Sequence, residues 1–289
     1  DTVRPSGAYV FRPSEQRSHR VGKVVHAELF QNGSIQEVHQ RFDVDYISQV
    51  VRLLPESDAI EFEWVVGPIP VQDGVGKEIV SRYISDLNNG KVFYTDANGR
   101  QMLQRTVDHR PSWRLQVHEP VAGNYYPVNS RMYLRDQTRN LQMSVLNDRT
   151  QGGTSLQNGT LELMVHRRLL HDDYFGVGEA LNEPGTDGRG LIIRGRHLVL
   201  LSSIKESAAE HRTLGQQLFM EPLISFSQFA EEYTNKYSTK LQGLTTDLPR
   251  NVHLLTLGEW RDDQLLLRLE RFYQKNEDAE LSKPVTVSL

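Results

Sequence analysis

The chain has 289 residues, of which 38% are hydrophobic, and its acidic and basic side chains nearly balance at a formal net charge of −4. This composition is typical of a folded globular protein with one large or two ordinary domains, and it argues against a disordered chain. Lysine and arginine are scattered along the sequence, so no nucleic-acid partner is predicted. The longest apolar run, Leu198 to Leu201, is far too short to span a bilayer, so no membrane association is predicted.

The chain contains no cysteine, which excludes disulfide and thiolate chemistry within it but does not assign a compartment. Its first residue is Asp1 and not methionine. We therefore expect that a targeting segment or a larger upstream piece has been removed, or that the chain was cut at this point.

Strands are predicted through most of the first half. Two apolar-rich runs flank Asn32-Gly33, a dipeptide that favours a two-residue hairpin turn with positive φ at both positions. Ile60, Phe62 and Trp64 alternate with glutamates, which indicates a strand with one buried and one solvated face. A second hairpin is predicted around Asn98-Gly99.

The second half continues with strands and contains one predicted helix. Residues 132–136 and 140–148 alternate in the same way, and residues 192–201 read as two strands or as one strand kinked about Gly195. Residues 207–219 favour a helix through their alanines and leucines. A polar connection from 234 to 247 marks a domain boundary. The three strand candidates that follow it are residues 252–257, 264–273 and 284–289.

Three strands are too few for a closed sandwich of their own. The sequence therefore predicts a mainly β protein. A large two-sheet β-sandwich is expected over residues 1–204, and a helical or irregular connector over 205–247. Residues 248–289 are expected to begin a smaller β-sandwich whose remaining strands lie outside this chain.

Residues 148–182 concentrate polar and turn-forming side chains beside one strand-like run, LELMVHRRLL. Along this run, Leu161, Leu163 and Val165 share one parity with Arg167, so Arg167 is predicted to point toward the buried side of an extended strand.

A half-buried arginine needs a carboxylate, and Asp172 and Asp173 follow at the end of the same run. A bidentate fork from one of them onto Arg167 or Arg168 would stiffen the turn as a structural polar cluster. The alternative is that these side chains form a polar wall of a ligand cleft.

A metal site or a catalytic pair is not predicted within this chain. His166 and His171 are the densest histidines beside the two aspartates, but five residues separate them and no established ligand spacing is matched. Asp172 and Asp173 are adjacent and point apart, whereas glycosidic cleavage needs carboxyl groups held about 5 to 10 Å apart.

Asn32-Gly-Ser and Asn158-Gly-Thr match the acceptor pattern for N-glycosylation. The same residues serve equally well as hairpin turns, so glycan attachment at Asn32 and Asn158 is one of two interpretations.

Four separated blocks identify a family by resemblance. SGAYVFRP near the start, FYTDANG, NYYPVNSRMYL and the stretch from 148 to 182 occur in the order found in the C-terminal half of glycoside hydrolase family 38 α-mannosidases. The closest resemblance is to the lysosomal, broad-specificity type, and it runs from about Ser6 to the last residue.

The resemblance implies a retaining, zinc-dependent exo-α-mannosidase that removes terminal α-mannose from N-glycan oligosaccharides in a lysosome or vacuole, or after secretion. In that family the catalytic aspartates and the zinc ligands lie in an N-terminal domain that this chain lacks. The implied partners are this N-terminal catalytic polypeptide, a further C-terminal polypeptide and a mannose-containing oligosaccharide. We therefore expect this chain alone to bind no zinc and to be inactive.

Two positions correspond by resemblance to family residues that contact mannose. Tyr9 is expected to hydrogen-bond the sugar or a catalytic carboxylate, although it also suits a core aromatic. The second is the arginine of an Asp-Asp-x-Arg-Gly pattern, where this chain has Phe175. That contact is lost, supplied by another residue, or replaced by stacking of a sugar on the phenyl ring.

A noncatalytic carbohydrate-binding or interaction module is the competing interpretation. Trp113, Tyr125 and Tyr126 would form its aromatic platform, although the two tyrosines fit equally well as packing around a proline-containing turn. Association with a larger zinc-containing polypeptide would distinguish the two functions.

Overall fold

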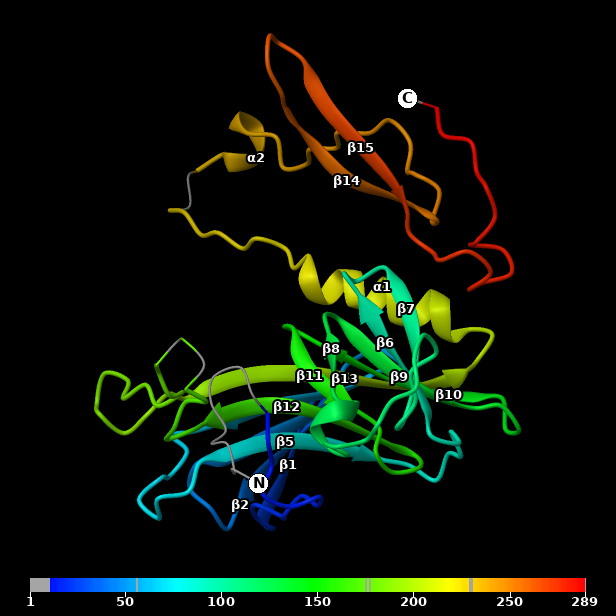
Figure 1. Cartoon of the computed structure of the whole chain (residues 1–289). Helices are drawn as coiled ribbons and strands as arrows, with labels where there is room; N and C mark the ends of the chain where they lie inside the picture. Colours follow the sequence, from blue (N-terminus) through cyan, green and yellow to red (C-terminus); the bar gives the residue numbers. More distant parts are fainter. Residues whose placement is uncertain (1–10, 56, 175, 177, 229–230, 289) are drawn as a thin grey trace. The chain divides into compact units, whose positions relative to one another are not determined.

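The computed structural model describes residues 11–55, 57–174, 176, 178–228 and 231–288. The chain divides into two compact units, residues 1–207 and 208–289. The chain is mainly β, as predicted: antiparallel strands dominate the first unit, whereas the second, over its described part, contains one two-stranded hairpin and two helices (Figure 1). Within the described residues, no helix is both long enough and apolar enough to cross a membrane.

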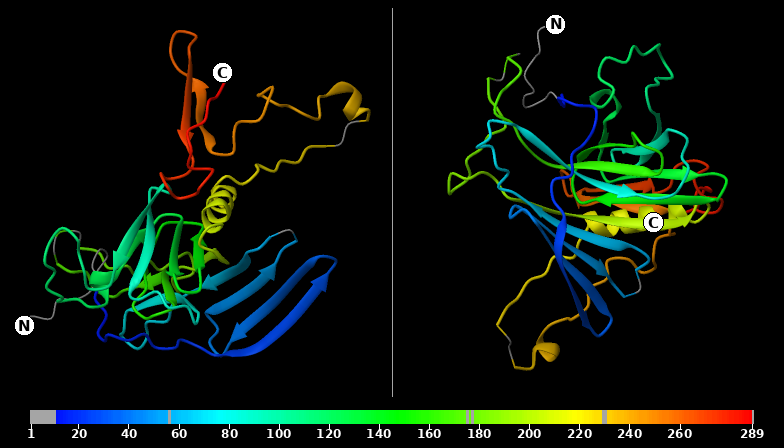
Figure 2. Two further views of the ribbon diagram at one scale, coloured as in Figure 1. Left: turned by 90° about the vertical axis from the view of Figure 1, so that its right-hand side faces the viewer. Right: turned by 90° about the horizontal axis from the view of Figure 1, so that it is seen from below.

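The first unit contains two antiparallel sheets that form a sandwich (Figure 2). In spatial order, the nine strands of the larger sheet are β1 (Val24–Asn32), β2 (Ile35–Phe42), β3 (Ile47–Leu53), β4 (Ile60–Val66), β13 (Ile193–Ser203), β10 (Leu141–Asn147), β9 (Arg131–Asp136), β6 (Val92–Ala97) and β7 (Gln101–Thr106). The smaller sheet contains β5 (Lys77–Ile84), β12 (Thr160–Arg168), β11 (Gln151–Thr154) and β8 (Tyr126–Val128), and a 3-10 turn at Ala122–Asn124 precedes β8.

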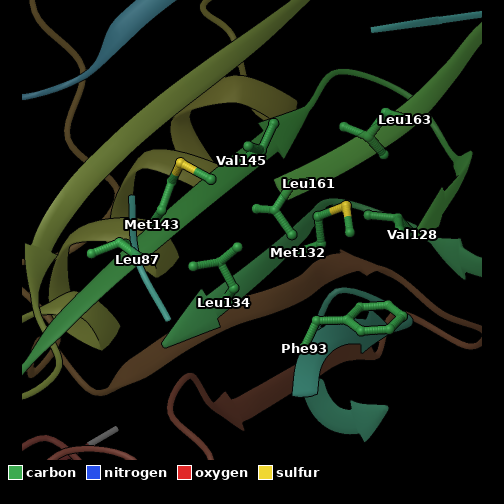
Figure 3. Packing of buried hydrophobic residues seen from close by; sticks show 9 residues of the cluster. All are labelled: Leu87, Phe93, Val128, Met132, Leu134, Met143, Val145, Leu161 and Leu163. Carbon is green, nitrogen blue, oxygen red and sulfur yellow. The ribbon is translucent and has the colours of Figure 1, made fainter. Parts of the chain in front are cut away.

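The main core lies between these two sheets. Leu161 and Leu163 of β12 pack with residues of β9 and β10, including Met132 and Val145 (Figure 3). Gly153 of β11 lies so close to this cluster that a Cβ atom would come within 2.9 Å of Met132 Sδ on β9 of the larger sheet. Gly153 therefore allows the smaller sheet to approach the larger one.

The alternation along β4 is confirmed at Trp64, which is buried, but it does not give a solvated glutamate face. Glu61 is only 8% exposed because Arg52 of β3 covers it, with Nη1 2.7 Å from Glu61 Oε1 and 2.6 Å from Glu63 Oε2. Ile60 at the start of β4 is exposed instead. Ion pairing across neighbouring strands explains how two carboxylates are accommodated on this face.

Both predicted hairpins form, with one shift. The residues between β1 and β2 are Gly33 and Ser34, and Asn32 pairs with Ile35 as the last ladder position. Only Gly33 of this turn has positive φ, so the turn lies one residue later than predicted. The second hairpin has positive φ at both Asn98 and Gly99, as predicted.

The predicted blocks FYTDANG and NYYPVNSRMYL meet at one buried carboxylate. Asp96 Oδ1 accepts backbone N–H bonds from Asn129, Ser130 and Arg131 at 2.8 to 3.2 Å. Asp96 Oδ2 accepts bonds from Gly99 N at 2.8 Å and from Ser130 Oγ at 2.9 Å. This carboxylate therefore ties the β6–β7 turn to the segment that enters β9.

Strand β13 is one continuous strand across Gly195, which decides between the two predicted alternatives. A Cβ atom at this position would overlap the indole of Trp64. The glycine thus gives room for the tryptophan on β4, which pairs with it.

The second unit contains α1 (Ser207–Phe219), α2 (Tyr233–Lys236), β14 (Val252–Glu259) and β15 (Leu265–Arg271). Helix α1, which begins at the boundary between the units, has the predicted bounds, whereas the short α2 was not predicted. The predicted strand at 284–289 is wrong over its described part, because residues 284–288 form no strand. Arg212 is buried in this unit, with Nε 2.5 Å from Glu277 Oε2 and Nη1 2.9 Å from the Phe272 carbonyl oxygen.

Candidate functional site

The two substrate-contacting residues implied by the resemblance, Tyr9 and Phe175, lie outside the described residues. The described residues that precede Phe175 in sequence include β12, which pairs with β5, and the start of the segment that leads from β12 to β13.

A β-bulge at Val165 changes the face on which Arg167 lies. Strand β12 pairs regularly with β5 as far as Met164, which lies opposite Val80. The next pair is His166 with Ile79, so Val165 is an extra residue in β12. Arg167 consequently pairs with Glu78 and shares a face with Met164. The prediction that Arg167 points to the side of Leu163 is wrong, because parity counting assumes a ladder without an extra residue.

Arg167 has the carboxylate that a half-buried arginine needs, and it comes from β5. Its Nε donates to Glu78 Oε1 at 2.8 Å, and its Nη2 also contacts that oxygen. Burial raises the pKa of Glu78, while the nearby charge of Arg167 and its hydrogen bond act in the opposite direction. The two side chains form an ion pair between neighbouring strands, next to the segment that contains Phe175.

Arg168 connects the end of β12 to two other segments. Its Nε donates to Asn182 Oδ1 at 2.7 Å, and its Nη1 donates to the carbonyl oxygens of Ile69 at 2.8 Å and Arg189 at 2.5 Å. Gly190 has a φ of 119°, and a Cβ atom there would come within 2.5 Å of Arg168 Nη1. Arg168 thus fixes the base of the 169–192 segment.

Asp172 and Asp173 lie at the start of this segment. Asp172 Oδ1 accepts a bond from the backbone N–H of Tyr174 at 3.1 Å, which forms a local turn. Asp173 is buried, whereas Tyr174 has positive φ and an exposed ring. The segment therefore presents Tyr174 to solvent directly before Phe175.

A second charged group lies on the same face as the Arg167–Glu78 pair. Arg82 of β5 donates from Nε to Glu162 Oε2 of β12 at 2.7 Å, and the hydroxyl of Tyr125 donates to Glu162 Oε1. Glu162 is buried, and burial also raises the pKa of Tyr125 above its usual value. We call the set of Glu78, Arg82, Tyr125, Glu162 and Arg167 the outer polar row.

Sequence reasoning missed three members of the outer polar row, Glu78, Arg82 and Glu162. Glu78 and Arg82 have the same parity on a strand, which is a signal for one face, but Glu162 is 80 residues away from Arg82. The hydrogen bonds of the outer polar row form two groups on one face, Glu78 with Arg167 and Glu162 with Arg82 and Tyr125. The outer polar row contains no nucleophile paired with a base.

His166 Nε2 lies 3.1 Å from the Leu191 carbonyl oxygen, within hydrogen-bond distance. Burial lowers the pKa of His166. Within the described residues, no three histidine, aspartate or glutamate side chains are placed to hold a metal ion.

The three aromatic residues considered for a sugar platform have different surroundings. Trp113 is exposed. Tyr125 belongs to the outer polar row and meets Phe11 edge-on, with ring centres 4.9 Å apart. The ring centre of Tyr126 lies 4.2 Å from the guanidinium carbon of Arg105, which is over the ring.

Both glycosylation motifs have an exposed asparagine. Asn32 ends β1 beside the hairpin turn. Asn158 uses its Oδ1 to accept backbone N–H bonds from Asn89 at 3.0 Å and from Gly90 at 3.2 Å. Attachment of a glycan to either residue stays a prediction.

Comparisons with known proteins show the family to which this chain belongs. A family model for the glycosyl hydrolases family 38 C-terminal domain matches residues 1–175. The chain is 50% identical to lysosomal alpha-mannosidase of Cavia porcellus, an alignment that covers 98% of this chain and 28% of that protein. It is 48% identical to lysosomal alpha-mannosidase of Homo sapiens, covering 100% of this chain and 28% of that protein.

More distant relatives agree. The chain is 41% identical to alpha-mannosidase of Canavalia ensiformis, covering 98% of this chain and 30% of that protein. The crystal structure of an alpha-mannosidase from Enterococcus faecalis V583 shares the fold, with a TM-score of 0.56 at 12% identity over 84% of this chain and 29% of that chain. The chain spans less than a third of the length of each of these relatives. These matches confirm the resemblance seen in the four sequence blocks, and the chain belongs to glycosyl hydrolase family 38, within its C-terminal domain.

Proposed function

We propose that this chain is the β-rich part of a retaining, zinc-dependent exo-α-mannosidase that removes terminal α-mannose from N-glycan oligosaccharides. The observation that carries the proposal is the 50% identity to a lysosomal alpha-mannosidase across 98% of the chain. A lysosomal or vacuolar location follows from the same relatives.

The chemistry belongs to the part of the enzyme outside this chain. In a retaining glycosidase one carboxylate attacks the anomeric carbon and a second protonates the leaving oxygen. The outer polar row offers no such pair, because Glu78 and Glu162 are each bound to an arginine. The described residues also do not fit a zinc ion, since no three suitable ligands converge. We therefore assign both catalytic carboxylates and the metal to the N-terminal polypeptide.

The role proposed for this chain is to supply part of the rim of the sugar site. Tyr9 would donate its hydroxyl to the sugar or to a catalytic carboxylate. Phe175 would offer an apolar ring where relatives are expected to place an arginine. Arg168 supports this role because its three bonds hold the base of the segment that contains Phe175. Tyr174 and Phe175 would then approach the sugar from a fixed support.

We further propose that strands from outside this chain complete the second unit. The hairpin of β14 and β15 pairs Leu257 with Leu267 and Glu259 with Leu265, and these three leucines are exposed. An isolated two-stranded hairpin is marginally stable in water. A further C-terminal polypeptide that covers this leucine face would give the smaller sandwich.

The proposal is tested by comparing the complete enzyme with this chain alone. We expect the complete enzyme to hydrolyse an aryl α-mannoside with retention of anomeric configuration and to lose activity after zinc is removed. We expect this chain alone to show no turnover and to contain no zinc by metal analysis. Turnover by this chain alone would overturn the assignment of the carboxylates. Binding of mannose oligosaccharides by this chain alone, without any partner, would favour the carbohydrate-binding module.

A further inference from the structure

The segment that follows Tyr9 is anchored to the first unit at Phe11. The phenyl ring of Phe11 meets the ring of Tyr125 edge-on, with ring centres 4.9 Å apart and an angle of 76° between the two planes. Both side chains are half-buried. An edge-to-face pair of this kind is stabilised beyond its apolar contact alone. Two residues of extended chain span about 7 Å at most, so an anchor at Phe11 restricts the reach of Tyr9.

Tyr125 is held at both ends, so its ring is a rigid support for Phe11. Its hydroxyl donates to Glu162 Oε1 on β12, and Glu162 Oε2 accepts a bond from Arg82 Nε on β5 at 2.7 Å. The residue before it, Asn124, is buried, and the carbonyl oxygen of Asn124 accepts a bond from Thr154 Oγ1 at 2.8 Å. The outer polar row therefore fixes the tip of Tyr125, and β11 fixes its base.

A second contact holds the residue after Phe11. Arg12 Nε lies 3.1 Å from Glu119 Oε1, in the loop that precedes Tyr125. This loop is tied by Asn124, whose Nδ2 donates to the carbonyl oxygen of Pro120 at 2.8 Å. An exposed ion pair contributes little to stability, so the effect expected of the Arg12–Glu119 pair is on the direction of the segment. Both anchors thus depend on one support, because Asn124 lies beside Tyr125 and binds the residue after Glu119.

We propose that Tyr125 is a positioning residue for Tyr9 that acts through Phe11, and that the Arg12–Glu119 pair orients the same segment. The inference rests on the proposed function, in which the Tyr9 hydroxyl donates to the sugar or to a catalytic carboxylate. A group in that role must be held closely, because a displacement of about 1 Å can lower the rate by up to roughly a hundredfold. Tyr125 therefore affects the reaction through the place of the Tyr9 hydroxyl.

Kinetics of the complete enzyme with an aryl α-mannoside test the contact at Phe11. Tyr125→Leu removes the ring that Phe11 meets and should lower kcat roughly tenfold, with a smaller change in KM, because the displaced hydroxyl acts mainly in the transition state. Tyr125→Phe keeps the edge-on contact and should retain kcat within about threefold. Tyr94→Leu is the matched control, since it removes one ring of a different pair, 4.7 Å from Tyr133, and should leave kcat unchanged.

The same substitution in a Tyr9→Phe background separates positioning from a general loss of structure. Without the Tyr9 hydroxyl there is no donor to displace, so Tyr125→Leu should change kcat by less than about twofold in that background. A loss by the same factor in both backgrounds would show a merely structural role and would overturn the proposal. An unchanged kcat in Tyr9→Phe alone would instead refute the proposed role of Tyr9, and this inference with it.

The Arg12–Glu119 pair gives a test that does not depend on the folding of Tyr125→Leu. Both side chains are partly exposed, at 36% and 43%, so their substitution leaves the core intact. Arg12→Glu should lower kcat about threefold because it repels Glu119, and the double variant Arg12→Glu, Glu119→Arg should restore kcat. An unchanged kcat in Arg12→Glu, or a loss that the double variant does not recover, would overturn the proposal.

Discussion

His197 is fully buried in the sandwich, and its hydrogen bonds fix it as a neutral side chain. Gln151 Nε2 donates to the Met164 carbonyl oxygen at 2.8 Å, so Gln151 Oε1 faces His197 Nε2 at 2.9 Å and accepts its proton. His197 Nδ1 therefore carries a lone pair and accepts the hydroxyl proton of Tyr83 at 2.8 Å. A second proton on the ring would require the Tyr83 hydroxyl to turn and accept instead of donate.

Burial lowers the pKa of His197 from 6.5 to about 4. In the unfolded chain the pKa is about 6.5, so between these values the unfolded state binds more protons than the folded state. The contribution of this group to stability is complete above pH 6.5 and is lost as the pH falls toward 4. The full loss is about 3 kcal/mol, since each pKa unit is worth about 1.4 kcal/mol.

The test is a comparison of His197→Asn with the parent in urea unfolding at pH 7 and pH 4.5. Asparagine does not titrate and keeps an acceptor for Tyr83, so the variant should be less stable at pH 7 because a cavity remains. Between pH 7 and pH 4.5, however, it should lose roughly 2 kcal/mol less free energy of unfolding than the parent loses. His118→Asn, at an exposed histidine, controls for the substitution itself. An equal loss in His197→Asn and in the parent would refute the reasoning.

Three further outcomes are expected. Asp96→Asn should lower the free energy of unfolding by about 2 to 3 kcal/mol, because one oxygen that accepts backbone N–H bonds becomes a donor; urea unfolding beside Asp45→Asn, at an exposed aspartate, checks this. Gly195→Ala should cost about 1 to 3 kcal/mol and alter tryptophan fluorescence, since the added methyl overlaps Trp64; an unchanged spectrum and stability would contradict the packing described. Tyr9→Phe in the complete enzyme should lower kcat for an aryl α-mannoside without changing the thermal midpoint, and an unchanged kcat would return Tyr9 to a core role.

Local signals predicted the parts of the fold that depend on neighbours in sequence. The bounds of α1 follow from helix propensity, and both Asn-Gly dipeptides marked a hairpin, although the turn of the first lies one residue later. The strand predicted at 284–289 failed because alternation alone does not form a strand without a partner to complete the ladder.

The candidate site was harder to predict because it depends on contacts between distant residues. The bulge at Val165 reverses the face of Arg167, and no glycine near Val165 marks it in the sequence. The carboxylate bound by Arg167 is Glu78, 89 residues earlier in the chain, whereas sequence reasoning searched among the aspartates nearby. Residues of equal parity share a face only in a regular ladder, and the β5–β12 ladder is irregular at Val165.

The three bonds of Arg168 have a genetic consequence. Residues near 69, 182 and 190 are far apart in the sequence. They all contact the guanidinium of Arg168 at the base of the 169–192 segment. A substitution such as Gly190→Val would displace that guanidinium and so weaken the bonds that hold the base of the whole 169–192 segment. A survey of inherited variants that looked only at Arg168 would therefore overlook position 190, although both determine how this segment is held.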